Sequence, residues 1–433
     1  METASESAEP LRDDGLALPG FEELEISGSG ATALDRPLWR ARTRTRVRAR
    51  LDVAVRQELL WIAVIYIAAR ILLLVAAYVQ GRFGHNPFQN ELTNWDGFWY
   101  RELANKGYPA HVSYGQTTLG FFPLFPISIW AVEHVLLPLS PSHLILFSSI
   151  AGVIVSGAGG LIATILVHRL AEGWWDRDTA RRATILFVLF PGAVVFSMVY
   201  SEGLLMPLAL GCIYALERRR WLLAGILAGF GTAVQPVGLM LAPVCLVAAV
   251  LEIRRRGWRA REGYRSLVAP ILSVTGMAGF MLFLWLWTGT PFANYIAQHH
   301  GWSESTSLLA LVHVAQKLGN QVSFSHFDEP TINLNYVIGL LGAVILTIEL
   351  VLVWFRRREI SVPALVWTAL ISFLAFTSSN VPPNPRMLIT AFPALIVIAR
   401  YARGRWFRVI AWVNGGLFVG LSLLTFYGLT LRP

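Results

Sequence analysis

The segment 94–126 holds the residue types best suited to chemistry. Its first carboxylate, Asp96, stands among aromatic side chains (Trp95, Phe98, Trp99 and Tyr100). A carboxylate can remove a proton from a hydroxyl, and aromatic neighbours suit a sugar or an isoprenoid ligand. The alternative is structural, because Asp96 occupies the position of a helix N-cap, where its carboxylate would bond the first amides. The local pattern leaves both interpretations open.

The residues around Asp96 predict a short helix. Trp95, Trp99 and Leu103 are spaced by four, which places them in one apolar stripe on a helix. Gly107 and Pro109 are typical of a helix end. Because Trp and Tyr favour the boundary between lipid and water, we expect this stripe to lie in a membrane interface.

The composition indicates a membrane protein. Of the 433 residues, 55% are hydrophobic and 15% are charged, whereas soluble domains carry roughly 25% charged residues. The mean hydropathy is +0.53, and several apolar runs approach the ~20 residues that cross a bilayer. We therefore predict an all-α polytopic membrane protein. The net charge of +9 lies mainly in short loops between apolar runs, so it indicates topology and not nucleic-acid binding.

Residues 1–55 are predicted to form a disordered cytoplasmic tail. The tail begins acidic and polar and ends in a basic patch (Arg40, Arg42, Arg44, Arg46, Arg48 and Arg50). This patch directly precedes a span, so we interpret it as contacting anionic lipid and not nucleic acid. The first apolar run begins near Glu58 with no small-residue cleavage site near the start, and we expect it to remain as an anchor. Residues 56–433 are predicted to form one transmembrane domain.

Apolar length and loop charge predict about eleven spans in that domain. They are 57–79, 143–167, 183–199, 202–216, 221–237, 239–253, 267–288, 333–355, 361–377, 387–400 and 409–429. With the N-terminus inside, the arginine-rich connections 168–182, 217–220, 253–266, 356–359 and 401–408 all fall on the cytoplasmic side. The outer side then receives a first loop, 80–142, and a second large loop, 289–332.

One further apolar run, 119–138, is predicted not to cross. It contains Pro123, Pro126, Glu133 and His134, and counting it as a span would move the arginines of 168–182 to the outside. We therefore expect an interfacial or re-entrant helix in the first outer loop, with its proline-broken backbone covered by protein.

Other polar residues near the outer ends of spans are candidates for ligand contacts. Arg386 lies in a proline-rich turn and is the strongest candidate for binding a phosphate; the alternative is an arginine that reaches to the interface. Glu202 begins a span, where an acid is either functional or favoured by the helix dipole. Gln235, beside Pro236, contacts either a ligand or a neighbouring helix. Weaker candidates for a phosphate contact are Arg101, His299, His300 and Lys317.

Three groups of motifs carry a family resemblance. The first is Trp95-Asp96-Gly97-Phe98-Trp99-Tyr100 with Gly107-Tyr108 and Phe121-Phe122-Pro123-Leu124-Phe125-Pro126. The second is Tyr200-Ser201-Glu202 with Leu216-Glu217-Arg218-Arg219 and the span opening at Trp221. The third is Asn384-Pro385-Arg386-Met387 with Phe392-Pro393. Together they resemble the PIG-V-type mannosyltransferases, in the GT-C class of enzymes that use polyprenyl-phosphate sugars. The chain departs from the family at Gln235, where a basic residue is usual.

The resemblance implies a GT-C-like fold with Asp96 as the catalytic carboxylate of the first outer loop. It also implies transfer of a mannosyl or other hexosyl group from a polyprenyl-phosphate sugar to an acceptor hydroxyl. We expect inversion, with Asp96 as general base and a phosphate leaving group that needs positive charge instead of a second acid. Residues expected to contact substrate are Trp95, Trp99, Tyr100, Arg101, Tyr108, Glu202 and Gln235.

The acceptor stays open between a lipid, a glycan and a protein, and no nucleic-acid partner is expected. No metal is assigned, because His299, His300, His313, His326, Asp328 and Glu329 share one loop without a zinc-site spacing; a divalent ion on the lipid phosphate is the alternative. A transporter or flippase of a lipid-linked substrate is the rival function. It would place ionisable residues within the spans, where Glu349 is the clearest case.

Overall fold

The computed structural model describes residues 38–83, 88–139, 144–322, 332–379 and 381–427. Residues 57–433 form one compact unit. Helix α1 begins at Leu38, and the part of the expected tail up to residue 37 lies outside the described residues. Within the described residues, the β pairing is limited to one isolated bridge between Thr306 and Ser378. The predicted all-α class is therefore confirmed.

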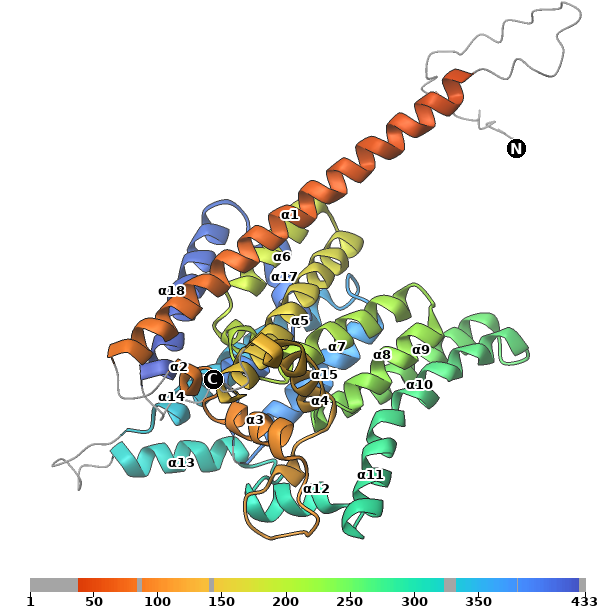
Figure 1. Cartoon of the computed structure of the whole chain (residues 1–433). Coiled ribbons are helices and arrows are strands. Elements are labelled where there is room, and N and C mark those ends of the chain that lie inside the picture. The colour runs from red at the N-terminus through yellow and green to blue at the C-terminus, as the bar shows by residue number, and fades with distance from the viewer. Residues whose placement is uncertain (1–37, 84–87, 140–143, 323–331, 380, 428–433) are drawn as a thin grey trace, which may run out of the picture. The chain divides into compact units, whose positions relative to one another are not determined.

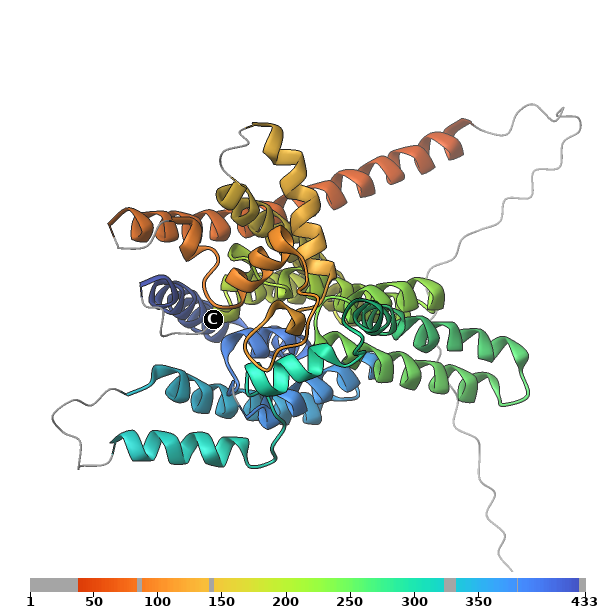
Figure 2. The ribbon, with the colours of Figure 1, turned by 60° about the horizontal axis from the view of Figure 1, so that its bottom comes forward.

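The described residues are largely helical. In chain order they are α1 (Leu38–Phe83), α2 (Phe88–Glu91), α3 (Asp96–Lys106), η1 (Thr118–Gly120), α4 (Leu124–Leu136), η2 (Leu137–Leu139), α5 (Leu144–Trp174), α6 (Arg177–Val188), η4 (Pro191–Ser197), α7 (Glu202–Glu217), α8 (Trp221–Thr232), η5 (Pro236–Met240), α9 (Leu241–Arg256), η6 (Arg261–Leu267), α10 (Val268–Ser273), α11 (Thr275–Thr288), α12 (Ala293–Ile296), η7 (Ala297–Gly301), α13 (Ala310–Val322), α14 (Leu334–Arg356), α15 (Val362–Thr377), α16 (Pro385–Thr390), α17 (Pro393–Tyr401) and α18 (Gly404–Tyr427). Helix α5 packs against α6 and α7, and α7 packs against α8 (Figure 1). Figure 2 shows α13 beside α14.

The count of eleven spans is not confirmed. Among the described residues, six helices are long and apolar enough to cross a membrane, and α6 with η4 makes a seventh if this bent pair is one span. The other four predicted spans coincide with α7, α8, α15 and the pair α16 and α17, which are shorter than the ~20 residues that a bilayer requires. Proline accounts for two of the breaks: Pro236 begins η5 within the predicted span 221–237, and Pro393 begins α17 within the predicted span 387–400.

A sharp bend separates α6 from η4, which meet at 72°. Pro191 begins η4 and cannot continue the hydrogen bonding of α6. The carbonyl oxygens left open there are bonded by Arg70 of α1, which donates to Val188 at 3.0 Å and also to Ala193. The guanidinium of Arg70 is buried and lies over the rings of Tyr66 and Phe418. This buried arginine therefore supplies hydrogen-bond donors to backbone carbonyl oxygens at the helix break.

The first loop contains α3 and α4, each of which buries one face in the protein. Helix α4 is 13 residues long, too short to cross a bilayer, and its backbone begins with a bond from the Leu124 amide to the Ala233 carbonyl at 3.0 Å. The apolar stripe of α3 packs largely against protein: Leu103 is buried, and Trp99 packs against Phe121 and Trp302. The apolar face of a helix can be covered either by neighbouring helices or by lipid, and helical spacing does not distinguish the two.

Replacing Arg70 by methionine tests its role at the helix break. Arg70→Met leaves the two carbonyl oxygens buried without a donor, which costs roughly 1–3 kcal/mol each. We expect the melting temperature of the protein in detergent to fall by several degrees. The control is Arg82→Met, at the exposed last turn of the same helix, which should not change it. An unchanged melting temperature for Arg70→Met would contradict this assignment.

Candidate active site

A salt bridge joins two residues that are 290 positions apart in the sequence. Nη1 of Arg386, in α16, lies 2.5 Å from Oδ2 of Asp96, the first residue of α3. The Asp96 side chain is 36% exposed and that of Arg386 is 18% exposed, so the pair is partly open to a ligand. Trp95 occupies the N-cap position without a side-chain cap bond. The carboxylate of Asp96 therefore pairs with an arginine instead of capping its helix.

A second carboxylate lies behind the same arginine. Oε1 of Glu202, the first residue of α7, is 3.5 Å from Nε of Arg386, and its side chain is only 7% exposed. The Arg386 guanidinium also lies 5.4 Å from the ring centre of Tyr200. Burial lowers the pKa of Arg386, but the charges of Glu202 and Asp96 outweigh that effect and hold the pKa above its ordinary value. One permanent cation is thus held between two acids.

Close backbone contacts bring these three side chains together. A Cβ on Gly97 would lie 3.0 Å from the Val199 carbonyl oxygen, so α3 can begin this close to Val199 because residue 97 is glycine. A Cβ on Gly192 would lie 2.0 Å from the carbonyl oxygen of Pro385, the residue before Arg386. Asn384 caps α16 through the amide of Met387 at 3.0 Å. The glycines and the cap fix where Asp96 and Arg386 meet.

A chain of hydrogen bonds links α3 to α7 and to the end of α8. The Tyr100 hydroxyl donates to Ser201 Oγ at 2.8 Å, and Ser201 donates to Gln235 Oε1 at 2.7 Å. Burial, and next the charge of Asp96, raise the pKa of Tyr100 well above its ordinary value, so this phenol stays protonated and donates. Ser201 lies between Tyr200 and Glu202, which both contact Arg386. These hydrogen bonds therefore connect α3, which begins at Asp96, to the segment 200–202 that contacts Arg386.

The remaining candidates of the first loop take supporting positions. Arg101 is buried and donates to Thr93 at 3.2 Å and to Ser149 at 3.4 Å. Tyr108 donates to the Phe121 carbonyl oxygen at 2.7 Å. Of the predicted site residues, Arg386 thus contacts Asp96, and Glu202 contacts Arg386. Tyr100 and Gln235 are joined through Ser201. Trp95 is half-buried, and its backbone has a positive φ of 60° at the start of α3.

The candidates in the second large loop are exposed and are not among the described residues paired with Asp96 or Arg386. His299 and His300 are exposed on η7, a π-helix, where their rings contact Tyr295 and Tyr114. Lys317 is exposed on α13. Within the described residues, no interaction joins any of these three to Asp96 or Arg386. The described part of the chain contains no group of three His, Cys, Asp or Glu arranged for a metal, while His326, Asp328 and Glu329 lie outside it.

Sequence reasoning missed several residues that build this site. Tyr200 and Ser201 flank or contact the predicted residues, but neither was given a role of its own. Gly192 and Asn384 position Arg386 from elements far apart in the sequence. The one available signal was the adjacency of Tyr200, Ser201 and Glu202 at a helix start, which places successive side chains in one region.

Comparison with known protein families shows to which family the chain belongs. Residues 70–311 match the family model described as Mannosyltransferase (PIG-V), which is more than half of the chain. The chain belongs to the PIG-V mannosyltransferase family. The match spans Asp96, Tyr100, Glu202 and Gln235, whereas Arg386 lies beyond it. Membership in this family confirms the resemblance seen in the motifs.

Solved structures resemble this PIG-V family chain only distantly. ArnT from Cupriavidus metallidurans bound to undecaprenyl phosphate is 15% identical, with a TM-score of 0.47 over 84% of this chain and 63% of that one. The Archaeoglobus fulgidus oligosaccharyltransferase in complex with Zn and sulfate is 15% identical, with a TM-score of 0.43 over 84% of this chain and 52% of that one. The chain thus spans between half and two thirds of their lengths, and no residue role is carried over from them. No curated protein matches the chain.

A double-mutant cycle on this PIG-V family protein tests the buried pair. Arg386→Gln leaves the Glu202 carboxylate buried without its cation, and we expect it to lower the free energy of unfolding by roughly 3 kcal/mol. In the double variant Glu202→Gln/Arg386→Gln, the loss should be smaller than the sum of the two single losses by about 0.5–3 kcal/mol. Denaturant unfolding in detergent measures all four forms.

The control cycle uses a solvated pair of similar chemistry. Arg169 and Glu172 are 3.0 Å apart, with side chains 29% and 38% exposed. Their substitutions by glutamine should be additive within about 0.5 kcal/mol, since exposed pairs contribute little. Additivity at Glu202 and Arg386 as well would show that the two side chains are not coupled.

Proposed function

We propose that this protein transfers a mannosyl residue, or another hexosyl residue, from a polyprenyl-phosphate sugar to an acceptor hydroxyl on the outer face of the cell membrane. The observation that carries the proposal is the salt bridge between Asp96 and Arg386, with Glu202 behind it, in a chain of the PIG-V family. This salt bridge places a carboxylate, which can accept the proton of an incoming hydroxyl, next to a cation, which can stabilise a departing phosphate.

Arg386 is the group that would bind the donor phosphate. A guanidinium has five donors, and Asp96 and Glu202 engage two of its nitrogens. An arriving phosphate would replace Asp96 at Nη1 and form a bidentate contact. Glu202 would keep its contact with Nε and hold the guanidinium in place, so it acts as a positioning residue. Donor binding thereby frees the carboxylate of Asp96 next to the sugar.

Asp96 would then act as general base. It accepts the proton of the acceptor hydroxyl as that oxygen attacks the anomeric carbon from the side opposite the phosphate. The bond between the anomeric carbon and the phosphate oxygen breaks, and the polyprenyl phosphate leaves as a monoester with the bonding electrons. Arg386 stabilises the charge that develops there. One attack from the opposite face inverts the anomeric configuration.

Helix α5 supports the proposed position of the site on the outer side. Near its start, Ser148 and Ser149 contact Asn105 and Arg101 of α3, and 20 residues later His168 lies 3.7 Å from Glu58, which also pairs with Arg177 and Arg181. Twenty residues of helix rise about 30 Å, the thickness of a bilayer core. This separation supports a site on the side opposite the arginines, and arginine-rich loops favour the cytoplasm.

Substituting the base tests the reaction. Asp96→Asn keeps the size of the side chain but removes its basicity, and we expect the rate of sugar transfer to fall by about 10²–10⁴-fold. The assay supplies purified protein with a labelled polyprenyl-phosphate mannose and a panel of lipid, glycan and protein acceptors. Asp178→Asn, an exposed residue of α6, is the control and should keep full activity.

Two results would overturn the assignment. Full turnover by Asp96→Asn would remove the general base. Movement of the lipid across the bilayer by the wild-type protein, with no product on any acceptor, would favour a transporter or flippase instead.

Cysteine labelling tests the orientation. Cys212 and Cys245 are buried, so the background from native thiols should be low. Gly115 is exposed, and a Cβ there meets no atom within 4 Å. An impermeant thiol reagent applied outside intact cells should label Gly115→Cys but not Arg259→Cys, which lies in an arginine-rich connection. The reverse pattern would place the candidate site on the cytoplasmic side.

A further inference from the structure

The second large loop contains a bridging segment, residues 302–307, that contacts both halves of the candidate site. The segment follows η7 and precedes α13. At its start, Trp302 contacts α3, the helix that begins with Asp96. Further along, its residues bond the turn 377–379, which leads to Arg386. One short segment therefore connects the element of the carboxylate with that of the cation.

Trp302 packs on α3 and on the loop that follows this helix. Its ring centre lies 5.0 Å from that of Trp99, which is one turn along α3 from Asp96. It also lies 5.6 Å from the ring centre of Phe121. Tyr108 donates to the Phe121 carbonyl oxygen at 2.7 Å and so holds this residue in place. The start of the bridging segment thus has a fixed position relative to α3.

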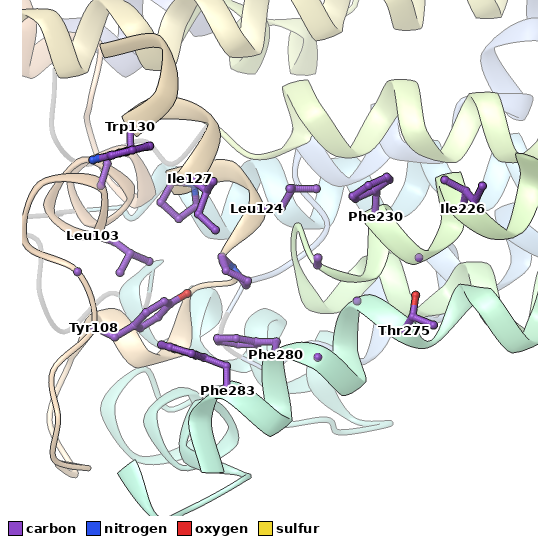
Figure 3. Close-up of a pocket in the computed structure, with 18 of the residues that line it drawn as sticks. Leu103, Tyr108, Leu124, Ile127, Trp130, Ile226, Phe230, Thr275, Phe280 and Phe283 are labelled. Carbon is purple, nitrogen blue, oxygen red and sulfur yellow. The ribbon is translucent and has the colours of Figure 1, made fainter. Parts of the chain in front are cut away.

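Helix α11 supports the same loop from the other side. Beside the apolar pocket between α3, α4, α8, α10 and α11, the ring of Tyr108 faces those of Phe280 and Phe283 (Figure 3). Its ring centre is 5.7 and 5.4 Å from theirs, respectively. Gln298 of η7 donates to the Gly120 carbonyl oxygen at 2.8 Å. The bridging segment therefore begins on a surface that several elements hold together.

The other end of the bridging segment bonds the turn 377–379. Oγ of Ser378 donates to Oε1 of Glu304 at 2.8 Å, and the hydroxyls of Ser305 and Ser379 are hydrogen-bonded at 2.6 Å. The amide of Ser379 donates to the Ser305 carbonyl oxygen at 3.0 Å. Thr306 forms the isolated β bridge with Ser378. Side chains and backbone therefore both fix this end.

Stiff backbone leads from this turn to Arg386. Pro382 and Pro383 restrict the φ angles of the connection. A Cβ on Gly342 would lie 2.2 Å from the Pro383 carbonyl oxygen, so α14 supports the connection in direct contact. Asn384 then caps α16, in which Arg386 is the second residue. A displacement of the turn 377–379 would therefore move the guanidinium as well.

We propose that the bridging segment sets the spacing between Asp96 and Arg386, with Glu304 as a positioning residue for sugar transfer. The proposal rests on the proposed function, in which a base and a phosphate-binding cation act on one sugar. In that reaction the phosphate displaces Asp96 from Arg386, so the salt bridge no longer joins α3 to α16. The contacts of Trp302 and Glu304 remain and keep the two elements at their working separation.

Two substitutions of Glu304 separate positioning from charge. Glu304→Ala removes the acceptor of the Ser378 hydroxyl. We expect kcat to fall about tenfold, because small displacements of reacting groups lower the rate steeply, while the KM for the donor stays unchanged. Glu304→Gln keeps an oxygen that can accept the same hydrogen bond and should retain the wild-type kcat.

The control for these substitutions is Glu262→Ala. Glu262 is an exposed acid of η6 that pairs with Arg256, and its loss should leave kcat unchanged. Membrane levels and melting temperatures establish that all variants fold. A wild-type kcat in Glu304→Ala would overturn the proposal, as would an equal loss in Glu304→Gln.

A disulfide tests whether the contact by itself restores activity. In Glu304→Ala, the further changes Ser305→Cys and Ser379→Cys place two thiols where the native hydroxyls meet. Diamide accepts two electrons and two protons as the S–S bond forms, and the native cysteines are buried. Oxidation should return kcat to the wild-type value, and a reductant should lower it again.

The same cysteine pair with Glu304 intact should gain no activity on oxidation. Mass spectrometry measures the extent of the crosslink. A complete crosslink without recovery of kcat in Glu304→Ala would overturn the proposal, and so would two thiols that do not pair.

A crosslinking measurement keeps this inference separate from the reaction. It uses Asp96→Cys and Arg386→Cys together with Glu202→Gln, so that no acid stays buried without its cation. A short bifunctional thiol reagent should link α3 to α16 in this protein. Adding Glu304→Ala should lower the yield of the link, and adding Glu304→Gln should not. The result is expected whether or not sugar transfer is observed, and an unchanged yield in Glu304→Ala would overturn the proposal.

Discussion

The structure of the candidate site depends on one guanidinium held between two carboxylates. Arg386 contacts Asp96 on its exposed side and Glu202 on its buried side, and the ring of Tyr200 lies against it. A cation in such surroundings stays charged, and the two acids fix its direction. In the proposed reaction, the partly exposed Asp96 would be the acid that an arriving phosphate replaces.

Irregular backbone positions this cation within a largely apolar protein. Helix α6 breaks before Pro191, and Arg70 bonds the carbonyl oxygens that the break leaves open. The following segment, η4, then places Gly192 against the carbonyl of Pro385. Backbone of this kind is tolerated in membranes where protein covers its polar groups. The break in α6 thus leads into the segment that contacts the residue before Arg386.

Local sequence features predicted individual elements well. The helix after Asp96, its end at Gly107, and the apolar segments of the domain all follow from helical periodicity and breaker residues. The same features did not predict which surface covers a helix face or where a predicted span is interrupted. The stripe of α3 packs largely against other helices, and several predicted spans are divided into short helices. Periodicity shows that a helix has an apolar face but not which surface covers it.

The sequence by itself determined the class of the protein and named both residues of the central salt bridge, because composition, helix starts and family motifs are all carried by neighbouring residues. It could not determine that Asp96 pairs with Arg386 instead of capping α3. These residues are 290 positions apart, and they meet because Gly97 and Gly192 permit close backbone contacts between distant segments. The apolar pocket between α3, α4, α8, α10 and α11 likewise forms only when these five helices pack together. Contacts of this range depend on the complete tertiary structure, since no local pattern encodes them.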